Sequence, residues 1–207
     1  LYPKLLNNYF SIILIKLPFM KLTVTLFFFL IFNSPFAFSQ DLKIGTQIWS
    51  ANDLNVTNYR NGDPIIKAQS SYEWMDSWKA KQGAYCIYNN QTFYNWYAVN
   101  DQRGLAPQGY HIPRVSEWLE LLNYLGGIQL PAGVLQKSGF FTKGTGSRDP
   151  LTGFNGYEKW SCWWSSEAYN SEKAYKCITY ITTKGAHVTH LGGMFESGMA
   201  IRCIRSK

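Results

Sequence analysis

The stretch GYHIPRVSEWLELLNYLGG, residues 109–127, decides which fold the chain can adopt. Five apolar side chains in it recur at spacings of three and four, and so share one face of an amphipathic helix: Val115, Trp118, Leu119, Leu122 and Leu125. Pro113 stands at the start of this helix, and Gly126 and Gly127 can take the left-handed conformation that ends one. We therefore predict one main helix at about 113–126.

Short aromatic segments before the main helix predict a helix and a hairpin. A short helix is expected at about 72–81, where Trp74 and Trp78 lie one turn apart and are interpreted as core residues. Residues 83–100, GAYCIYNNQTFYNWYAVN, predict two strands joined at Asn89 and Asn90.

Segments after the main helix predict further strands. Residues 160–166 and 174–183 are expected to form an antiparallel pair whose turn is 167–173, and 187–191 and 199–204 are the last expected strands. Many short strands and few helices predict an α+β fold, with antiparallel strands packed on the one main helix.

The first 39 residues resemble a leader rather than part of the folded domain. Residues 20–39 hold a charged start, an apolar run at 22–32 and small residues before Gln40, which predicts a signal peptide cleaved between Ser39 and Gln40. Residues 1–19 are interpreted as upstream read-through or a non-native extension. The expected product is a single domain at 40–207, secreted or held in the cell envelope.

A membrane anchor is the alternative interpretation of this N-terminal region. Lys16 and Lys21 interrupt its apolar character, and neither apolar segment alone reaches the roughly 20 residues that a spanning helix needs. We therefore expect no stable membrane insertion of the mature chain.

The charge of the mature chain gives little support to nucleic-acid binding. Cleavage removes Lys4, Lys16 and Lys21, which lowers the formal net charge from +7 to +4. The remaining lysines and arginines are scattered and form no run of five or six, so the pattern favours a solvated, mildly basic surface.

Four cysteines lie in the mature part, and an even number in an exported chain predicts two disulfides. A metal site is the alternative, but it calls for paired C-x-x-C spacing, which the sequence lacks. If 160–166 and 174–183 pair about their turn, Cys162 and Cys177 come roughly opposite one another. Cys86 and Cys203 would then form the second bridge.

Enzymatic interpretations find little support in the residue pattern. His187 and His190 stand three apart in a β-prone stretch, so they face opposite sides of a strand and cannot jointly hold a metal. Ser165, Ser166 and Glu167 have no histidine placed by a recognisable motif. His111 is expected to hydrogen-bond loop backbone. We predict no catalytic residue, metal or cofactor.

Several stretches of the mature chain resemble the Fibrobacter succinogenes major paralogous domain, a family of exported bacterial proteins, and they occur in that family's order: IGTQIWSANDLN (44–55), YRNGDPI (59–65), GAYCIYNN (83–90), YNWYAVND (94–101), RGLAPQGYHIP (103–113), SEWLELLNYLGG (116–127), WWSS (163–166) and IRCIRS (201–206). The resemblance implies a C-type-lectin-like fold whose termini meet in one sheet. It also implies kinship with formylglycine-generating-type domains, whose chemistry needs a close cysteine pair.

Two departures from the family pattern bear on the site. Arg114 stands where the family has Thr or Ser as the N-cap of the main helix, so that helix lacks the usual capping oxygen. The loop before Trp160 is short, and in lectin-like folds the long loop carries the ligand.

Exposed aromatic and polar side chains in two turns are the candidate ligand-binding residues: Tyr157, Glu158, Trp160, Glu167, Tyr169 and Asn170. Trp96, Trp118, Trp163 and Trp164 are interpreted as core residues, since a small domain with one main helix needs their area. The leading hypothesis is a lectin-like domain that binds a glycan or a surface protein. The alternatives are an enzyme related to formylglycine-generating domains and a structural surface module.

Overall fold

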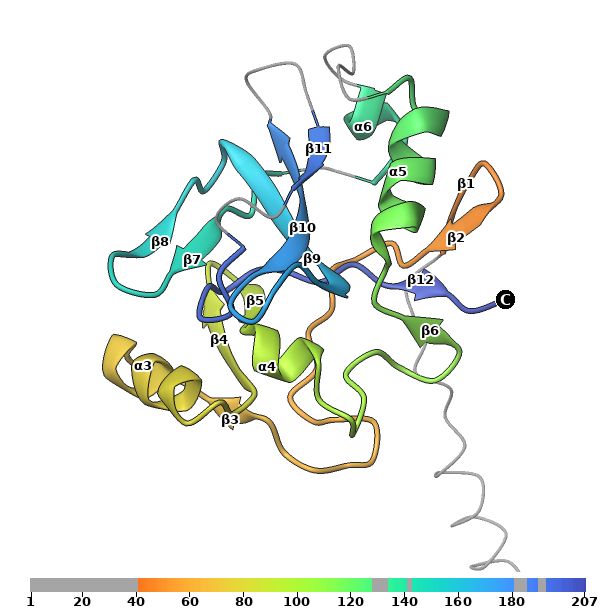
Figure 1. Ribbon diagram of the computed structural model, residues 1–207. Coiled ribbons are helices and arrows are strands. Elements are labelled where there is room, and N and C mark those ends of the chain that lie inside the picture. The colour runs from red at the N-terminus through yellow and green to blue at the C-terminus, as the bar shows by residue number, and fades with distance from the viewer. Residues whose placement is uncertain (1–40, 128–133, 141–142, 181–185, 190–192) are drawn as a thin grey trace, which may run out of the picture. The chain divides into compact units, whose positions relative to one another are not determined.

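The computed structural model describes residues 41–127, 134–140, 143–180, 186–189 and 193–207, which form an α+β arrangement of short strands and few helices (Figure 1). Its helices are α3 (Ser71–Lys79), α4 (Trp96–Val99), α5 (Val115–Tyr124) and α6 (Val134–Lys137). Its strands are β1 (Leu42–Ile44), β2 (Gln47–Trp49), β3 (Ile66–Lys67), β4 (Ala84–Tyr88), β5 (Gln91–Tyr94), β6 (Tyr110–His111), β7 (Ser147–Asp149), β8 (Gly153–Asn155), β9 (Trp160–Ala168), β10 (Ala174–Tyr180), β11 (Ala186–Thr189) and β12 (Ile204–Arg205).

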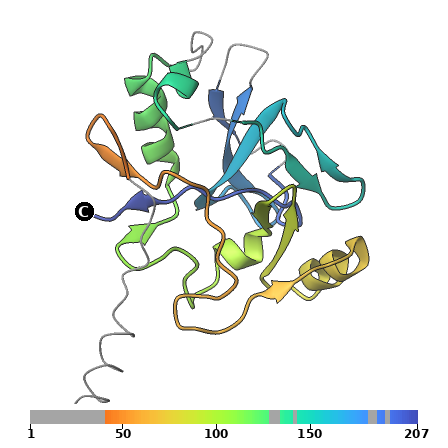
Figure 2. The same ribbon diagram turned by 180° about the vertical axis from the view of Figure 1, so that it is seen from behind.

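The sheets meet along the C-terminal segment of the chain. β1 and β12 belong to one four-stranded sheet of order β1-β2-β12-β6, so the expected meeting of the two terminal strands is confirmed. Bridges from Met199 to Tyr94 and from Ala200 to Trp163 place the segment before β12 between β5 and β9. This links the β3-β4-β5 sheet to the β11-β10-β9 sheet, as the reverse view also shows (Figure 2).

The main helix forms where the sequence predicts it, but its buried face is rotated from the predicted one. Trp118, Leu121 and Leu122 are buried, whereas Leu119 is 40% exposed. Successive side chains point about 100° apart around a helix axis. The side chain of Leu119 is therefore turned about 100° from that of the buried Trp118 and faces away from the core. None of the described helices is long and apolar enough to cross a membrane.

The predicted hairpin and short helix are also present, with one correction. Asn89 and Asn90 adopt the positive φ angles of 47° and 61° that a tight two-residue turn needs. After β5 the chain forms α4 and not the expected strand. Asn95 begins this helix because its Oδ1 accepts a hydrogen bond from the Ala98 N–H at 3.0 Å.

The predicted Cys162–Cys177 disulfide is wrong, because the register of β9 and β10 is one residue from the expected one. Cys162 lies opposite Ile178, and Cys177 lies opposite Trp163. A shift of one residue sends a side chain to the other face of a sheet. All four cysteines are buried free thiols, so Cys86 and Cys203 do not form the second bridge.

The two faces of the β9–β10 pair have different neighbours. Trp163 and Cys177 pack with Trp118 of α5 in one buried cluster. Cys162 and Trp164 belong to a second cluster on the other face. Five of the six tryptophans that the sequence assigns to the core are at most 2% exposed, namely Trp74, Trp96, Trp118, Trp163 and Trp164. The sixth, Trp78, is only partly buried. The face that carries Cys162 lines a cavity beside the β7–β8 hairpin.

Candidate functional site

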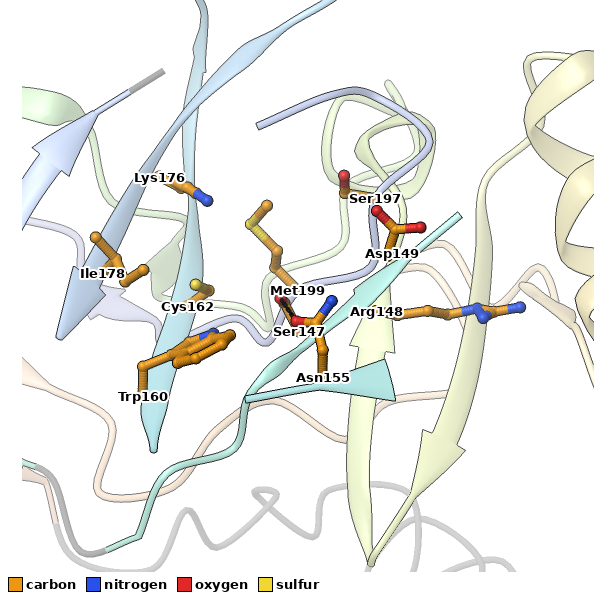
Figure 3. A pocket seen from close by; sticks show the side chains of 10 residues that line it. All are labelled: Ser147, Arg148, Asp149, Asn155, Trp160, Cys162, Lys176, Ile178, Ser197 and Met199. Carbon is orange, nitrogen blue, oxygen red and sulfur yellow. Dashed lines mark hydrogen bonds between the residues drawn. The ribbon is translucent and has the colours of Figure 1, made fainter. Parts of the chain in front are cut away.

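A cavity of about 250 Å³ lies between the β7–β8 hairpin, the β9–β10 pair and the segment at 197–199 (Figure 3). Its wall includes Asn155 of β8, Trp160 and Cys162 of β9, and Lys176 of β10. The register explains this grouping. Trp160, Cys162 and Trp164 alternate along β9, so their side chains lie on one face of the sheet. On β10, Ile178 lies opposite Cys162, and Lys176 lies opposite Trp164, so both side chains lie on that same face.

Lys176 is a charged residue on the middle strand of a buried sheet. It is 9% exposed, and no carboxylate among the described residues forms an ion pair with it. Its ammonium points into the cavity (Figure 3). Burial raises the pKa of the neighbouring Cys162 thiol to about 11, while the Lys176 charge opposes that rise. Cys162 is therefore a neutral thiol at physiological pH.

The other two charged residues of the wall are already engaged. Asp149 Oδ1 accepts hydrogen bonds from the backbone N–H groups of Thr152 at 2.8 Å and Leu151 at 2.9 Å. These bonds hold the pKa of Asp149 below its usual value, so it is ionised. The Arg148 guanidinium points away from the cavity (Figure 3) and lies 4.8 Å from the centre of the Trp74 ring.

Trp160 is held in place by the loop that precedes it. Gly156 has a φ of +71°, and a Cβ added to it would come within 1.9 Å of Trp160 Cε2. Only glycine allows the indole to lie this close to the backbone. Tyr157 and Glu158 belong to the same loop but form a separate surface cluster, in which Lys143 Nζ is 2.9 Å from Glu158 Oε1 and 4.8 Å from the Tyr157 ring centre.

The remaining candidate residues lie at the other end of β9. This strand is nine residues long, which at about 3.3 Å per residue separates its ends by about 26 Å. Glu167 accepts a hydrogen bond from the Val115 N–H. Asn170 Oδ1 accepts from the N–H groups of Glu172 and Lys173, and Tyr169 packs edge-on against Tyr175. The structure therefore divides the six candidates among three places, and of the six only Trp160 lines the cavity.

His111 joins the helix start to the C-terminus through side chains and not through loop backbone as predicted. Its Nε2 lies 2.9 Å from Glu117 Oε1, and its Nδ1 lies 3.1 Å from Ser206 Oγ. Glu117 also accepts the Arg114 N–H at 2.8 Å, so its carboxylate is committed to the start of α5. The described residues contain no group of three or more His, Cys, Asp or Glu side chains that could hold a metal ion, and His190 lies outside them.

Lys176 is the important site residue that sequence reasoning missed. It stands in AYKCITY, a strand that is otherwise apolar apart from its threonine. Lysine is almost never fully buried unless it is paired, so a lysine between apolar neighbours in a predicted central strand is the signal that would have found it. Asp149 and Asn155 lie in a loop-rich stretch whose sequence gives no such signal.

A comparison with protein-family models matches residues 42–205 to the Fibrobacter succinogenes major domain. The chain belongs to this family. The match extends over nearly all of the described residues, from β1 to β12, and confirms the resemblance carried by the motifs. No curated protein and no solved structure matches the chain. The candidate site of this Fibrobacter succinogenes major domain is therefore argued from its own residues.

Proposed function

We propose that the mature chain is an exported, lectin-like binding domain that recognises a glycan on a cell surface or on a surface protein. The observation that carries this proposal is the cavity beside Trp160, where an aromatic wall adjoins the polar side chains of Asn155, Asp149 and Lys176. Ligand sites typically combine an apolar wall with a few convergent polar groups.

The C-type-lectin-like fold and the exported location belong to this proposal. Three features support them: the leader-like composition of residues 20–39, the presence of β1 and β12 in one sheet, and a single main helix packed on β9 and β10. The scattered basic residues give no reason to expect a nucleic-acid partner.

The arrangement of the cysteines gives no support to the alternative of a formylglycine-generating-type enzyme. That chemistry needs two close, reactive cysteines, whereas Cys177 and Cys203 lie in different buried clusters. Burial also raises the pKa of both thiols, so neither is a thiolate at neutral pH.

A glycan array probed with the purified full chain tests the proposal. We expect binding to a restricted set of glycans, and a loss of that binding in Trp160→Leu. Tyr72→Leu is the matched control, because Tyr72 is a 68% exposed aromatic residue on α3 and does not line the cavity. If the array is empty and a pull-down from cell-surface extract is empty too, the binding proposal fails and a purely structural role is favoured.

A further inference from the structure

We propose that the cavity selects an acidic sugar, with the ligand carboxylate bound by Lys176 and the sugar ring packed on Trp160. This inference rests on the binding function proposed above and names the chemical class of its ligand. It starts from two groups of the cavity wall: the Lys176 ammonium, which points into the cavity, and the indole of Trp160 (Figure 3).

Lys176 provides a positive charge that the described protein leaves uncompensated. Only 9% of the Lys176 residue is exposed, and its ammonium points into the cavity (Figure 3). No acidic side chain among the described residues forms an ion pair with it. An ammonium can only donate hydrogen bonds. A ligand group that binds to the Lys176 ammonium must therefore accept hydrogen bonds, and an anionic acceptor forms stronger hydrogen bonds than a neutral one.

The neighbouring charges favour a monoanion that also carries hydroxyl groups. Asp149 is ionised and lines the same cavity, so it would repel a phosphate or sulfate dianion. Arg148 does not offset this repulsion, because its guanidinium is turned toward Trp74. Sugar hydroxyls can donate to the Asp149 carboxylate and can either donate to or accept from the Asn155 amide.

The size of the cavity and the fixed position of Trp160 suit one sugar ring. A volume of about 250 Å³ lies just below the roughly 300–1,000 Å³ of typical small-molecule pockets, so the cavity suits a ligand of about one sugar ring. Trp160 cannot swing freely, because its indole lies against Gly156. A rigid aromatic face is a suitable surface for the apolar side of a pyranose ring.

Isothermal titration of the full chain with four small probes tests this inference: D-galacturonate, its methyl ester, D-galactose and acetate. Galacturonate and the ester share one ring and differ in charge, whereas acetate has the charge without the ring. N-acetylneuraminate, added as a fifth probe, distinguishes a uronate from a sialate as the source of the carboxylate. We expect one of these two acidic sugars to bind at least about tenfold more tightly than the ester, galactose and acetate.

Lys176→Met isolates the charge, because methionine keeps most of the length of the side chain and removes the ammonium. We expect this variant to lose acidic-sugar binding by about tenfold or more while keeping its melting temperature, since it removes an unpaired buried cation. Lys173→Met is the control, as Lys173 lies in the preceding turn and does not line the cavity. If Lys176→Met does not fold, the comparison of acid and ester on the unmodified chain still decides the question.

Each result has a distinct meaning. Equal binding of galacturonate and its ester, or binding that Lys176→Met leaves unchanged, overturns the acidic-sugar inference. If neutral glycans bind and depend on Trp160 but not on Lys176, the proposed function stands and this inference fails. If no sugar binds, acidic or neutral, in the titrations or on the array, and the pull-down is empty too, both fail.

Discussion

The carboxylate of Glu167, at the end of β9, accepts a hydrogen bond from the backbone N–H of Val115, the first residue of α5. Arg114, the N-cap residue, has no side-chain oxygen, and a guanidinium cannot accept a hydrogen bond. Glu167 therefore supplies from a distant strand what Ser or Thr would supply locally, and its charge also suits the positive end of the helix.

Glu167→Ala is expected to lower the free energy of unfolding by about 0.5–2 kcal/mol, the usual effect of losing an N-cap. Arg114→Ser introduced into this variant should recover part of the loss, because it restores a local cap. Urea denaturation measures both effects. Glu172→Ala is the control, since Glu172 is an exposed carboxylate in the turn after β9. Equal effects of the Glu167 and Glu172 variants would contradict the capping role.

The thiol content of the protein tests the corrected cysteine assignment. Ellman's reagent should detect four thiols per chain in guanidinium chloride and almost none in the native protein. Burial raises the pKa of Cys86 and Cys203 to about 12, and that of Cys162 to about 11, so the reactive thiolate is scarce as well as inaccessible. Detection of only two thiols, or none, in denaturant would show that disulfides form after all.

How far the sequence predicts this fold depends on whether the signal is local. The position of α5 and the Asn89-Asn90 turn were predictable, because spacing and turn chemistry act over a few residues. The register of β9 against β10 was not, since one residue of offset decides whether Cys162 and Cys177 share a face. Glu167 as a cap for Val115 could not be foreseen either, because the contact joins residues 52 positions apart.

The residues of the candidate site also differ in whether their role has a local signal in the sequence. Trp160 was predictable from its place in a polar loop, and it does line the cavity. Lys176 and Asp149 reach the same cavity from two other segments, and only tertiary structure brings them there. Tyr169 and Asn170 look like Trp160 in sequence context but lie at the far end of β9. Turn composition indicates exposure, but it does not show which exposed residues converge.

The buried ion pair between Asp53 and Arg202 is expected to contribute strongly to stability. Arg202 Nε lies 2.7 Å from Asp53 Oδ1, with the two side chains 7% and 8% exposed, and Trp163 Nε1 donates to the same oxygen at 2.8 Å. Removing one partner leaves a buried charge alone. Asp53→Ala and Arg202→Met should each cost about 3–5 kcal/mol, measured by urea denaturation.

The surface pair of Arg205 and Asp41 is the matched control for this measurement. Their side chains are 52% and 22% exposed, so Arg205→Met should cost no more than about 1 kcal/mol. The double variant of Asp53 and Arg202 should lose less than the sum of the single losses, because the second substitution removes the charge that the first leaves unpaired. Strict additivity would rule out the coupling.

Asp149 should make stability depend on acid pH. Its folded-state pKa lies below the usual value because backbone N–H groups, that of Thr152 first, bond to the carboxylate. Its contribution is therefore fully present above the unfolded pKa of about 3.9 and is lost as pH falls through the lower folded value. We expect Asp149→Asn to be less stable than the unmodified protein at pH 7, with the difference shrinking below about pH 4.

Urea titrations at several pH values between 7 and 3 measure this difference. Asp76→Asn serves as the control for the loss of one exposed carboxylate, because Asp76 lies on the outer side of α3. A stability difference between Asp149→Asn and the unmodified protein that grows as pH falls would have the wrong sign for a lowered pKa, and would contradict the described turn.

Gly156 is expected to be required for both stability and the shape of the cavity. Its φ of +71° disfavours any side chain, and an added Cβ would overlap the Trp160 indole. Gly109 has a similar φ of +81° with nothing within 4 Å of an added Cβ. Gly109→Ala should thus cost only the left-handed penalty of about 1–2 kcal/mol, whereas Gly156→Ala should add about 1–3 kcal/mol of overpacking.

The same pair of variants links the loop to ligand binding. Gly156→Ala can relieve the overlap only by moving the indole, so acidic-sugar binding should fall along with stability, while Gly109→Ala should bind as the unmodified protein does. Titration at a temperature where both variants remain folded separates the two effects. If Gly156→Ala binds normally despite its loss of stability, the Trp160 face is not the surface that the sugar ring contacts.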